Sequence, residues 1–153
     1  MITVSIISHE QLSILNNLLE EIINNSDIRI ILTINIPEDE SVLKKYINND
    51  KLQIVRNLKA KGFGENHNHA FSLSESEYFM ILNPDVITDA SIFDKLVYLM
   101  QSRNLSVLAP ISVDKNKNIV ESARMFPKLY TPLVRLFVHK NDYDLTKNII
   151  YNV

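Results

Sequence analysis

The stretch "KLQIVRNLKAKGFGENHNHAFSLSESEYFMILNPD" (Lys51–Asp85) decides the fold, because it gives the order strand, loop, helix, strand. Its first and last segments, Lys51–Val55 and Glu77–Leu82, are rich in strand-forming residues. The loop between them holds both glycines of the chain, Gly62 and Gly64, and leads into a helix expected over about residues 64–74. Glycine permits positive φ and a close approach to the backbone, so this loop is predicted to need αL geometry or to face a ligand.

The same alternation of strand and helix continues upstream and downstream of this stretch. Ile2–Ser8 and Ile28–Ile34 are apolar β-branched runs without alternation, which is typical of strands buried on both faces of a sheet. Residues 10–25 have apolar side chains at helical spacing, 36–47 open with proline and acids as a helix start does, and 89–100 are helical with an acid as N-cap. The pattern predicts an α/β fold with a mostly parallel sheet.

The last third of the chain is predicted to hold a strand pair and a helix. Residues 105–114 and 118–126 suit two strands joined by the polar turn "DKNKN". A helix is expected from Pro132, and Asn148–Val153 reads as the start of another strand. At 153 residues the chain is expected to form a single domain, 1–153.

Composition excludes several classes of protein and of site. The net charge of −2 provides no basic field for nucleic acid. Because there is no cysteine, disulfides and thiolate metal sites are excluded. The N-terminus lacks the features of a signal peptide, and no apolar run reaches the roughly 18 residues that span a bilayer. We expect a cytoplasmic protein, and peripheral association with the inner face of the membrane stays open.

Ligands of open parallel sheets bind outside the carboxyl ends of the strands, where polar residues follow each apolar run here. The acid Asp85 and the amide Asn83 come directly after the strand that ends at Leu82. Their oxygens suit a hard cation such as Mg²⁺ or Mn²⁺, which could bridge a diphosphate. Asn-Pro-Asp is also a good turn sequence, so a purely structural role is the alternative.

The glycine loop is a candidate anion site, because backbone N–H groups at Gly62–Gly64 precede a helix and Lys61 adds a positive charge. It matches neither a dinucleotide fingerprint nor a P-loop. His67 and His69 lie two positions apart, so on a helix they point to different faces, which disfavours a zinc site.

Five stretches in this order resemble one family: "VSIIS", "IRIILTIN", "KGFGENHNHAF", "YFMILNPDV" and "ESARMFPKLYTPLVRLF". They are similar to the N-terminal, nucleotide-binding half of inverting family 2 glycosyltransferases. The variant Leu-Asn-Pro-Asp of the family's DXD motif, and the Gly-Phe-Gly stretch, resemble its bacterial rhamnosyltransferase-like branch. The resemblance implies the GT-A fold, a Rossmann-like three-layer sandwich around a mostly parallel sheet.

Several site residues follow from the resemblance alone. Asp85 would be the second acid of the DXD-like motif and would meet the metal and the diphosphate, with Asn83 in the first position. The other nucleotide-sugar contacts would come from strand ends and from the glycine loop: Ser8, His9, Asn35, Lys61, Gly62, Gly64 and Asn68. The sequence departs from the family at Ile34, Ala60 and Ala70, and His67 stands in place of an asparagine.

The implied activity is inverting transfer from a nucleoside-diphosphate sugar, dTDP-rhamnose or a UDP-sugar, to a saccharide or lipid-linked saccharide in polysaccharide biosynthesis. No catalytic base is identified, because the family position is expected beyond Val153. A second interpretation is a non-catalytic nucleotide-binding or oligomerisation module derived from a truncated glycosyltransferase, with a homo-oligomer as one form. A third, a response-regulator-like domain, is disfavoured because strand one is followed by only one carboxylate, Glu10.

Overall fold

The computed structural model describes residues 1–25, 27–114, 116 and 118–119. The chain divides into two compact units, Met1–Val107 and Leu108–Val153. The predicted helix from Pro132 and the predicted strand Asn148–Val153 lie outside the described residues. No helix in the described part of the chain is long and apolar enough to cross a membrane.

The first unit is built on a sheet of four parallel strands in the order β3-β2-β1-β4. These are β1 (Ile2–Ser8), β2 (Ile28–Ile34), β3 (Leu52–Arg56) and β4 (Tyr78–Leu82). Strand β1 pairs with β2 along its whole length and with β4 from Ile2 to Ile6. The predicted α/β class with a parallel sheet is confirmed, and the carboxyl ends of all the strands lie at one edge.

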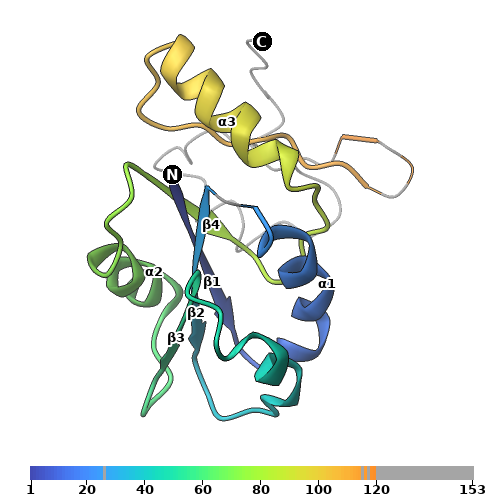
Figure 1. Ribbon diagram of the computed structural model, residues 1–153, viewed down its shortest axis with the longest axis vertical. Helices are drawn as coiled ribbons and strands as arrows, with labels where there is room; N and C mark the ends of the chain where they lie inside the picture. The colour runs from blue at the N-terminus through green and yellow to red at the C-terminus, as the bar shows by residue number, and fades with distance from the viewer. Residues whose placement is uncertain (26, 115, 117, 120–153) are drawn as a thin grey trace, which may run out of the picture. The chain divides into compact units, whose positions relative to one another are not determined.

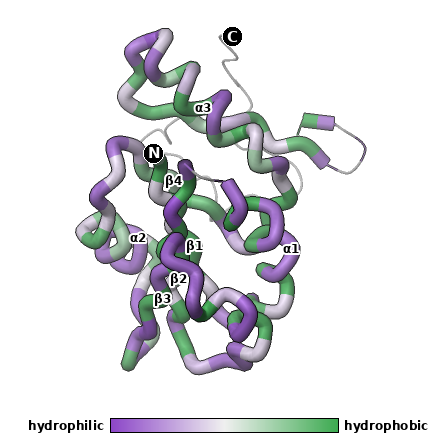
Figure 2. Tube along the Cα trace, viewed as in Figure 1, coloured by the Kyte–Doolittle hydropathy of each residue, from purple (hydrophilic) through white to green (hydrophobic). Residues whose placement is uncertain are grey.

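One face of the sheet carries the hydrophobic core. Helix α1 (Leu12–Ile22) buries residues at positions spaced for one helical face: Leu12, Leu15, Leu18, Leu19 and Ile22. These side chains pack with the alternate strand residues Ile2, Val4, Ile6, Ile28, Ile30 and Leu32, and Phe93 of α3 (Ser91–Ser102) joins the same cluster. The alternation of polar and apolar colour along α1 in Figure 2 reflects this amphipathic pattern.

The opposite face of β1 is small and polar, and α2 (Phe63–Ser72) covers it (Figure 1). Ser5 of β1 is fully buried and lies 2.8 Å from His67 Nδ1 on α2. Thr3 donates to Ser76 Oγ and accepts from Ser74 Oγ, both at 2.8 Å, in the segment that follows α2. Hydrogen bonds therefore hold α2 and the segment after it on the sheet, whereas aliphatic packing holds α1.

Two predicted elements differ from the structure. The expected helix over 36–47 is only a 3₁₀ helix, η1 (Ser41–Tyr46), because the Asp39 side chain bonds the Ser41 amide in a local turn and Asn49 starts the next turn. Helix α3 is capped at Ala90, with Asp89 one position earlier accepting from the Ser91 amide. Most of the second strand of the expected pair lies outside the described residues, and the described part contains the antiparallel bridge Val113–Ile119.

Truncation of one core residue tests the assignment of the α1 face. Leu15 is fully buried, whereas Ile14 on the same helix is half exposed. Leu15→Ala should lower the free energy of unfolding by about 2–5 kcal/mol, because it removes buried hydrocarbon and leaves a cavity. Ile14→Ala, the matched control, should change it by less than about 0.5 kcal/mol in the same urea titration. Equal costs for the two variants would contradict the assigned face.

Candidate nucleotide-binding site

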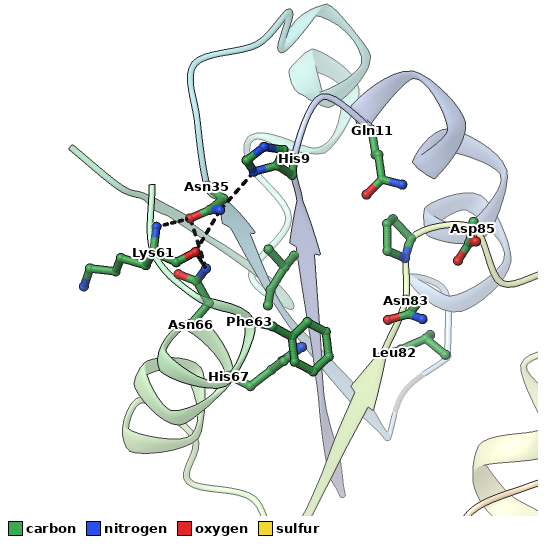
Figure 3. Close-up of a pocket in the computed structure, with 12 residues that line it drawn as sticks. His9, Gln11, Asn35, Lys61, Phe63, Asn66, His67, Leu82, Asn83 and Asp85 are labelled. Atoms are coloured by element: carbon green, nitrogen blue, oxygen red, sulfur yellow. Dashed lines mark hydrogen bonds between the residues drawn. The ribbon is translucent and has the colours of Figure 1, made fainter. Parts of the chain in front are cut away.

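A pocket of about 350 Å³ lies at the carboxyl edge of the sheet. Residues from every layer of the first unit line it: Ile7, His9, Gln11, Asn35, Lys61, Phe63, Asn66, His67, Leu82, Asn83, Pro84 and Asp85. Figure 3 shows Asn35, Lys61 and Asn66 on one side of the pocket, and Asn83 and Asp85 from the end of β4 on the other. Five of the predicted site residues therefore meet here: His9, Asn35, Lys61, Asn83 and Asp85.

Asn35, directly after β2, organises the first side of the pocket. Its Oδ1 accepts from the Lys61 backbone N–H at 2.9 Å, and its Nδ2 donates to the Lys61 carbonyl at 3.1 Å. Since a backbone N–H only donates and a carbonyl only accepts, these two bonds fix the orientation of the amide. The same Oδ1 accepts from Asn57 Nδ2 at 2.9 Å and from Asn66 Nδ2 at 3.0 Å. We call Asn35, Asn57, Lys61 and Asn66 the amide cluster.

The orientation of Asn35 also fixes the tautomer of His9. The second Nδ2 hydrogen of Asn35 points to His9 Nδ1 at 3.0 Å. An amide nitrogen only donates, so His9 Nδ1 accepts and neutral His9 carries its proton on Nε2. The polar atoms of Asn35 are thus fully used within the protein, and the side chain is 6% exposed. Asn35 lines the pocket as predicted, and its hydrogen bonds also hold Lys61 and His9, which line the pocket too.

The N-terminus of α1 is already occupied by the protein's own oxygens. Glu38 Oε2 accepts from the Leu12 N–H at 2.9 Å, and Ser8 Oγ accepts from the Gln11 N–H at 3.2 Å. Ser8 is fully buried and does not line the pocket. The structure therefore places this predicted ligand contact at a helix start, and the neighbouring Gln11 lines the pocket in its place.

The end of β4 supplies the acidic side of the pocket. Asn83 and Asp85 are exposed around the buried Pro84. No hydrogen bond of the Asp85 carboxylate is found among the described residues, so its oxygens are free to bind a ligand or cation. Within the same part of the chain no three His, Cys, Asp or Glu side chains cluster as a metal site. A single carboxylate such as that of Asp85 can supply one oxygen ligand to a hard cation.

The two glycines do not have the predicted backbone geometry. Neither has positive φ, and Gly62 is the extended N-cap of α2 at φ −68° and ψ 158°. A Cβ at either position would meet no atom within 4 Å, and neither residue lines the pocket. The expected αL geometry is wrong because Gly62 simply enters the helix and Gly64 lies within its first turn. The space beside both residues is open.

Helix α2 presents a different residue set to the pocket from the predicted one. Asn68 and His69 are exposed, whereas Asn66, His67 and Ala70 are buried. The buried three follow the i, i+1, i+4 spacing of one helix face, and this spacing was the signal that could have selected Asn66 over Asn68. His67 is 3% exposed, and its ring packs edge-on against Phe63 at 4.4 Å between centroids. Burial lowers the pKa of His67, which favours the neutral ring.

Removal of the Asn35 amide should loosen the first side of the pocket. Asn35→Ala leaves the Lys61 N–H without its acceptor and removes one of the two acceptors of the buried Asn66 amide, so the free energy of unfolding should fall by about 1–3 kcal/mol. Amide hydrogen exchange at Lys61 should accelerate in parallel. Asn68→Ala, at an exposed position of the neighbouring helix, should change both quantities little. Unchanged exchange at Lys61 in Asn35→Ala would show that Asn35 does not hold this loop.

The open space at Gly64 gives a prediction of opposite sign. Because Gly64 is helical and a methyl group fits there, Gly64→Ala should raise the free energy of unfolding by about 0.5–1 kcal/mol. Urea denaturation at constant m-value measures the change. A loss of stability would mean that the first turn of α2 differs from the helix described here.

Comparison with known proteins places this fold. The family described as "Glycosyl transferase family 2" matches residues 3–150. Among solved structures, S. aureus TarS 1-349 superposes with a TM-score of 0.59 at 14% identity, covering 67% of this chain and 33% of that chain. Crystal structures of the same protein in complex with UDP and with UDP-GlcNAc give the same score and identity. No curated protein sequence matches the chain.

The chain thus spans about a third of the TarS 1-349 structure that it resembles. At that identity the likeness concerns the fold, which is the GT-A fold that the resemblance to family 2 glycosyltransferases implied. The family match extends over nearly the whole sequence and includes both sides of the pocket. The chain belongs to glycosyl transferase family 2.

Proposed function

We propose that this chain binds a nucleoside-diphosphate sugar in the carboxyl-edge pocket and is the donor-binding part of an inverting glycosyltransferase. The observation that carries the proposal is the arrangement of the pocket in Figure 3, with the amide cluster, which includes Lys61, on one side and Asp85 on the other. The nucleoside would lie near His9 and Lys61. The diphosphate would extend toward Asn83 and Asp85.

Mg²⁺ or Mn²⁺ is the proposed cofactor, and the exposed Asp85 carboxylate, which has no hydrogen-bond partner among the described residues, fits one ligand position for it. When bound, such a cation would neutralise charge on a departing nucleoside diphosphate. The chain's own residues would hold the donor. Lys61 supplies a positive charge, which forms an ion pair with Glu65 at 3.5 Å, and Asn83 supplies an amide. His9 Nε2–H, fixed by Asn35, is a donor toward the nucleoside.

The donor is proposed to be a UDP-sugar or dTDP-rhamnose. Complexes of the structurally similar TarS with UDP and UDP-GlcNAc support the uridine nucleotide. The stretches around Gly62–Gly64 and Asn83–Asp85 support the rhamnosyltransferase-like branch. We further propose a saccharide or lipid-linked saccharide acceptor, in bacterial cell-surface polysaccharide synthesis at the cytoplasmic face of the membrane.

The alternative is a nucleotide-binding or oligomerisation module without turnover, derived from a truncated glycosyltransferase. Under either alternative we propose a single domain over 1–153. The glycosyltransferase and the nucleotide-binding module would both bind the donor, whereas a module that serves only in oligomerisation would not. Asp85 is the single carboxylate among the described residues that line the pocket, so a base for the acceptor hydroxyl is not identified there. Sugar transfer to an added acceptor would distinguish the enzyme from the module.

Metal-dependent nucleotide binding tests the donor site. Calorimetry should show that UDP binds the wild-type chain on the order of tenfold more tightly with Mn²⁺ than without it. Asp85→Ala should abolish this difference, because it removes the pocket carboxylate. Asp94→Ala, which removes an exposed acid on α3 outside the pocket, should preserve it. Absence of UDP and dTDP binding, with or without Mn²⁺, would overturn the proposal, and dTDP binding alone would assign the other nucleotide.

A further inference from the structure

His67 is a buried polar side chain of the pocket that the family resemblance does not explain. It lines the pocket, is 3% exposed, and has one hydrogen-bond partner in the described structure, Ser5 Oγ at 2.8 Å from Nδ1. Its other nitrogen, Nε2, is buried without a partner among the described residues. A buried polar atom without a partner costs roughly 1–3 kcal/mol, and a ligand oxygen that accepted from it would offset this cost.

The Ser5–His67 pair determines which ring nitrogen carries the proton. If Nδ1–H donated to Ser5, the buried Ser5 hydroxyl hydrogen would need another acceptor, and no described contact supplies one. If Ser5 O–H donates to Nδ1, both Ser5 and Nδ1 are satisfied, and the neutral ring carries its proton on Nε2. The second arrangement leaves one unsatisfied group instead of two. Nε2–H is therefore a fixed donor at the pocket.

The position of His67 indicates which part of a ligand it meets. In Figure 3 the Phe63 and His67 rings lie between the amide cluster and the strand end at Leu82 and Asn83. Lys61 and His9 line the side of the pocket proposed for the nucleoside, and Asp85 lines the acidic side. Packing against Phe63 and the bond to Ser5 hold the imidazole in place. In the proposed binding mode, a ring between the two sides would lie near the linkage between nucleoside and sugar.

We propose that His67 Nε2–H donates a hydrogen bond to an oxygen of the diphosphate or sugar of a bound nucleotide sugar. This inference rests on the proposed function, and it makes His67 a binding residue within that site. Because the ring is neutral, it would bind the ligand through one directional hydrogen bond to an acceptor oxygen and would not add a positive charge to the pocket. Its contribution should be that of one hydrogen bond, about a tenfold change in affinity.

Nitrogen NMR of the wild-type chain reads the donor directly and needs no variant. Long-range ¹H–¹⁵N spectra of the free protein should show His67 protonated on Nε2 only. Addition of UDP should shift the Nε2 resonance, and addition of uridine should leave it in place. If UDP shifts it no further than uridine, UDP-GlcNAc assigns the contact to the sugar. A proton on Nδ1, or an Nε2 resonance unmoved by saturating UDP and UDP-GlcNAc, would overturn the proposal.

Calorimetry on variants measures the contribution of the bond. His67→Phe keeps a ring but loses the donor, and should weaken binding of UDP, or of UDP-GlcNAc where the sugar is the partner, about tenfold. His67→Gln places an amide donor near Nε2 and should restore most of the affinity. His69→Gln, at an exposed position of the same helix, should bind as the wild type does. Uridine affinity should not distinguish His67→Phe from the wild type.

The outcomes separate this inference from the proposed function. If the wild type binds none of UDP, UDP-GlcNAc and dTDP, the proposed function fails and the role of His67 fails with it. If the wild type binds both and His67→Phe binds them equally well, only the role of His67 is wrong. Should His67→Phe not fold, the wild-type NMR titration still decides the question.

Discussion

The structure of the first unit depends on the two parallel ladders of β1. Because β1 is hydrogen-bonded to β2 on one side and β4 on the other, the ends of these strands are brought to one edge. Because successive side chains of β1 point to opposite faces of the sheet, one face is apolar and the other carries hydroxyl groups. Val4 and Ile6 pack into the aliphatic core, whereas Thr3 and Ser5 bond the α2 side. The pocket forms where the polar face and the strand ends meet.

Asn35 converts this general geometry into a defined binding surface. A side-chain amide that pairs with both backbone groups of Lys61 acts as a short extension of β2 toward a loop that belongs to no strand. It also orients His9 and shares its oxygen with Asn57 and Asn66. On the acidic side of the pocket, the buried Pro84 restricts the backbone between Asn83 and Asp85, so this segment does not depend on a comparable set of side-chain hydrogen bonds.

Much of the fold could be predicted from sequence, because β-branched runs and helical spacing report burial directly. The extents of β1 and β2 agree with their apolar runs, and Asn83 and Asp85 come to the predicted edge. The 3₁₀ form of η1 depends on local turns at Asp39 and Asn49, which propensity does not reveal. The roles of Asn35 and His67 depend on partners 26 and 62 positions away, Lys61 and Ser5, so spacing along the chain could not indicate them.

The way α2 is attached to the sheet has a consequence for local opening. Two of its three buried residues, Asn66 and His67, are polar, and Phe63 and Phe71 are about 60% exposed. Hydrogen bonds lose their strength steeply with angle, whereas aliphatic contacts tolerate small rotations. The helix should therefore detach as a cooperative unit while the α1 side stays folded. A ligand that bridged both sides of the pocket would then stabilise the attached form of α2 when it binds. Amide hydrogen exchange in α2 should therefore become slower as the pocket fills with ligand.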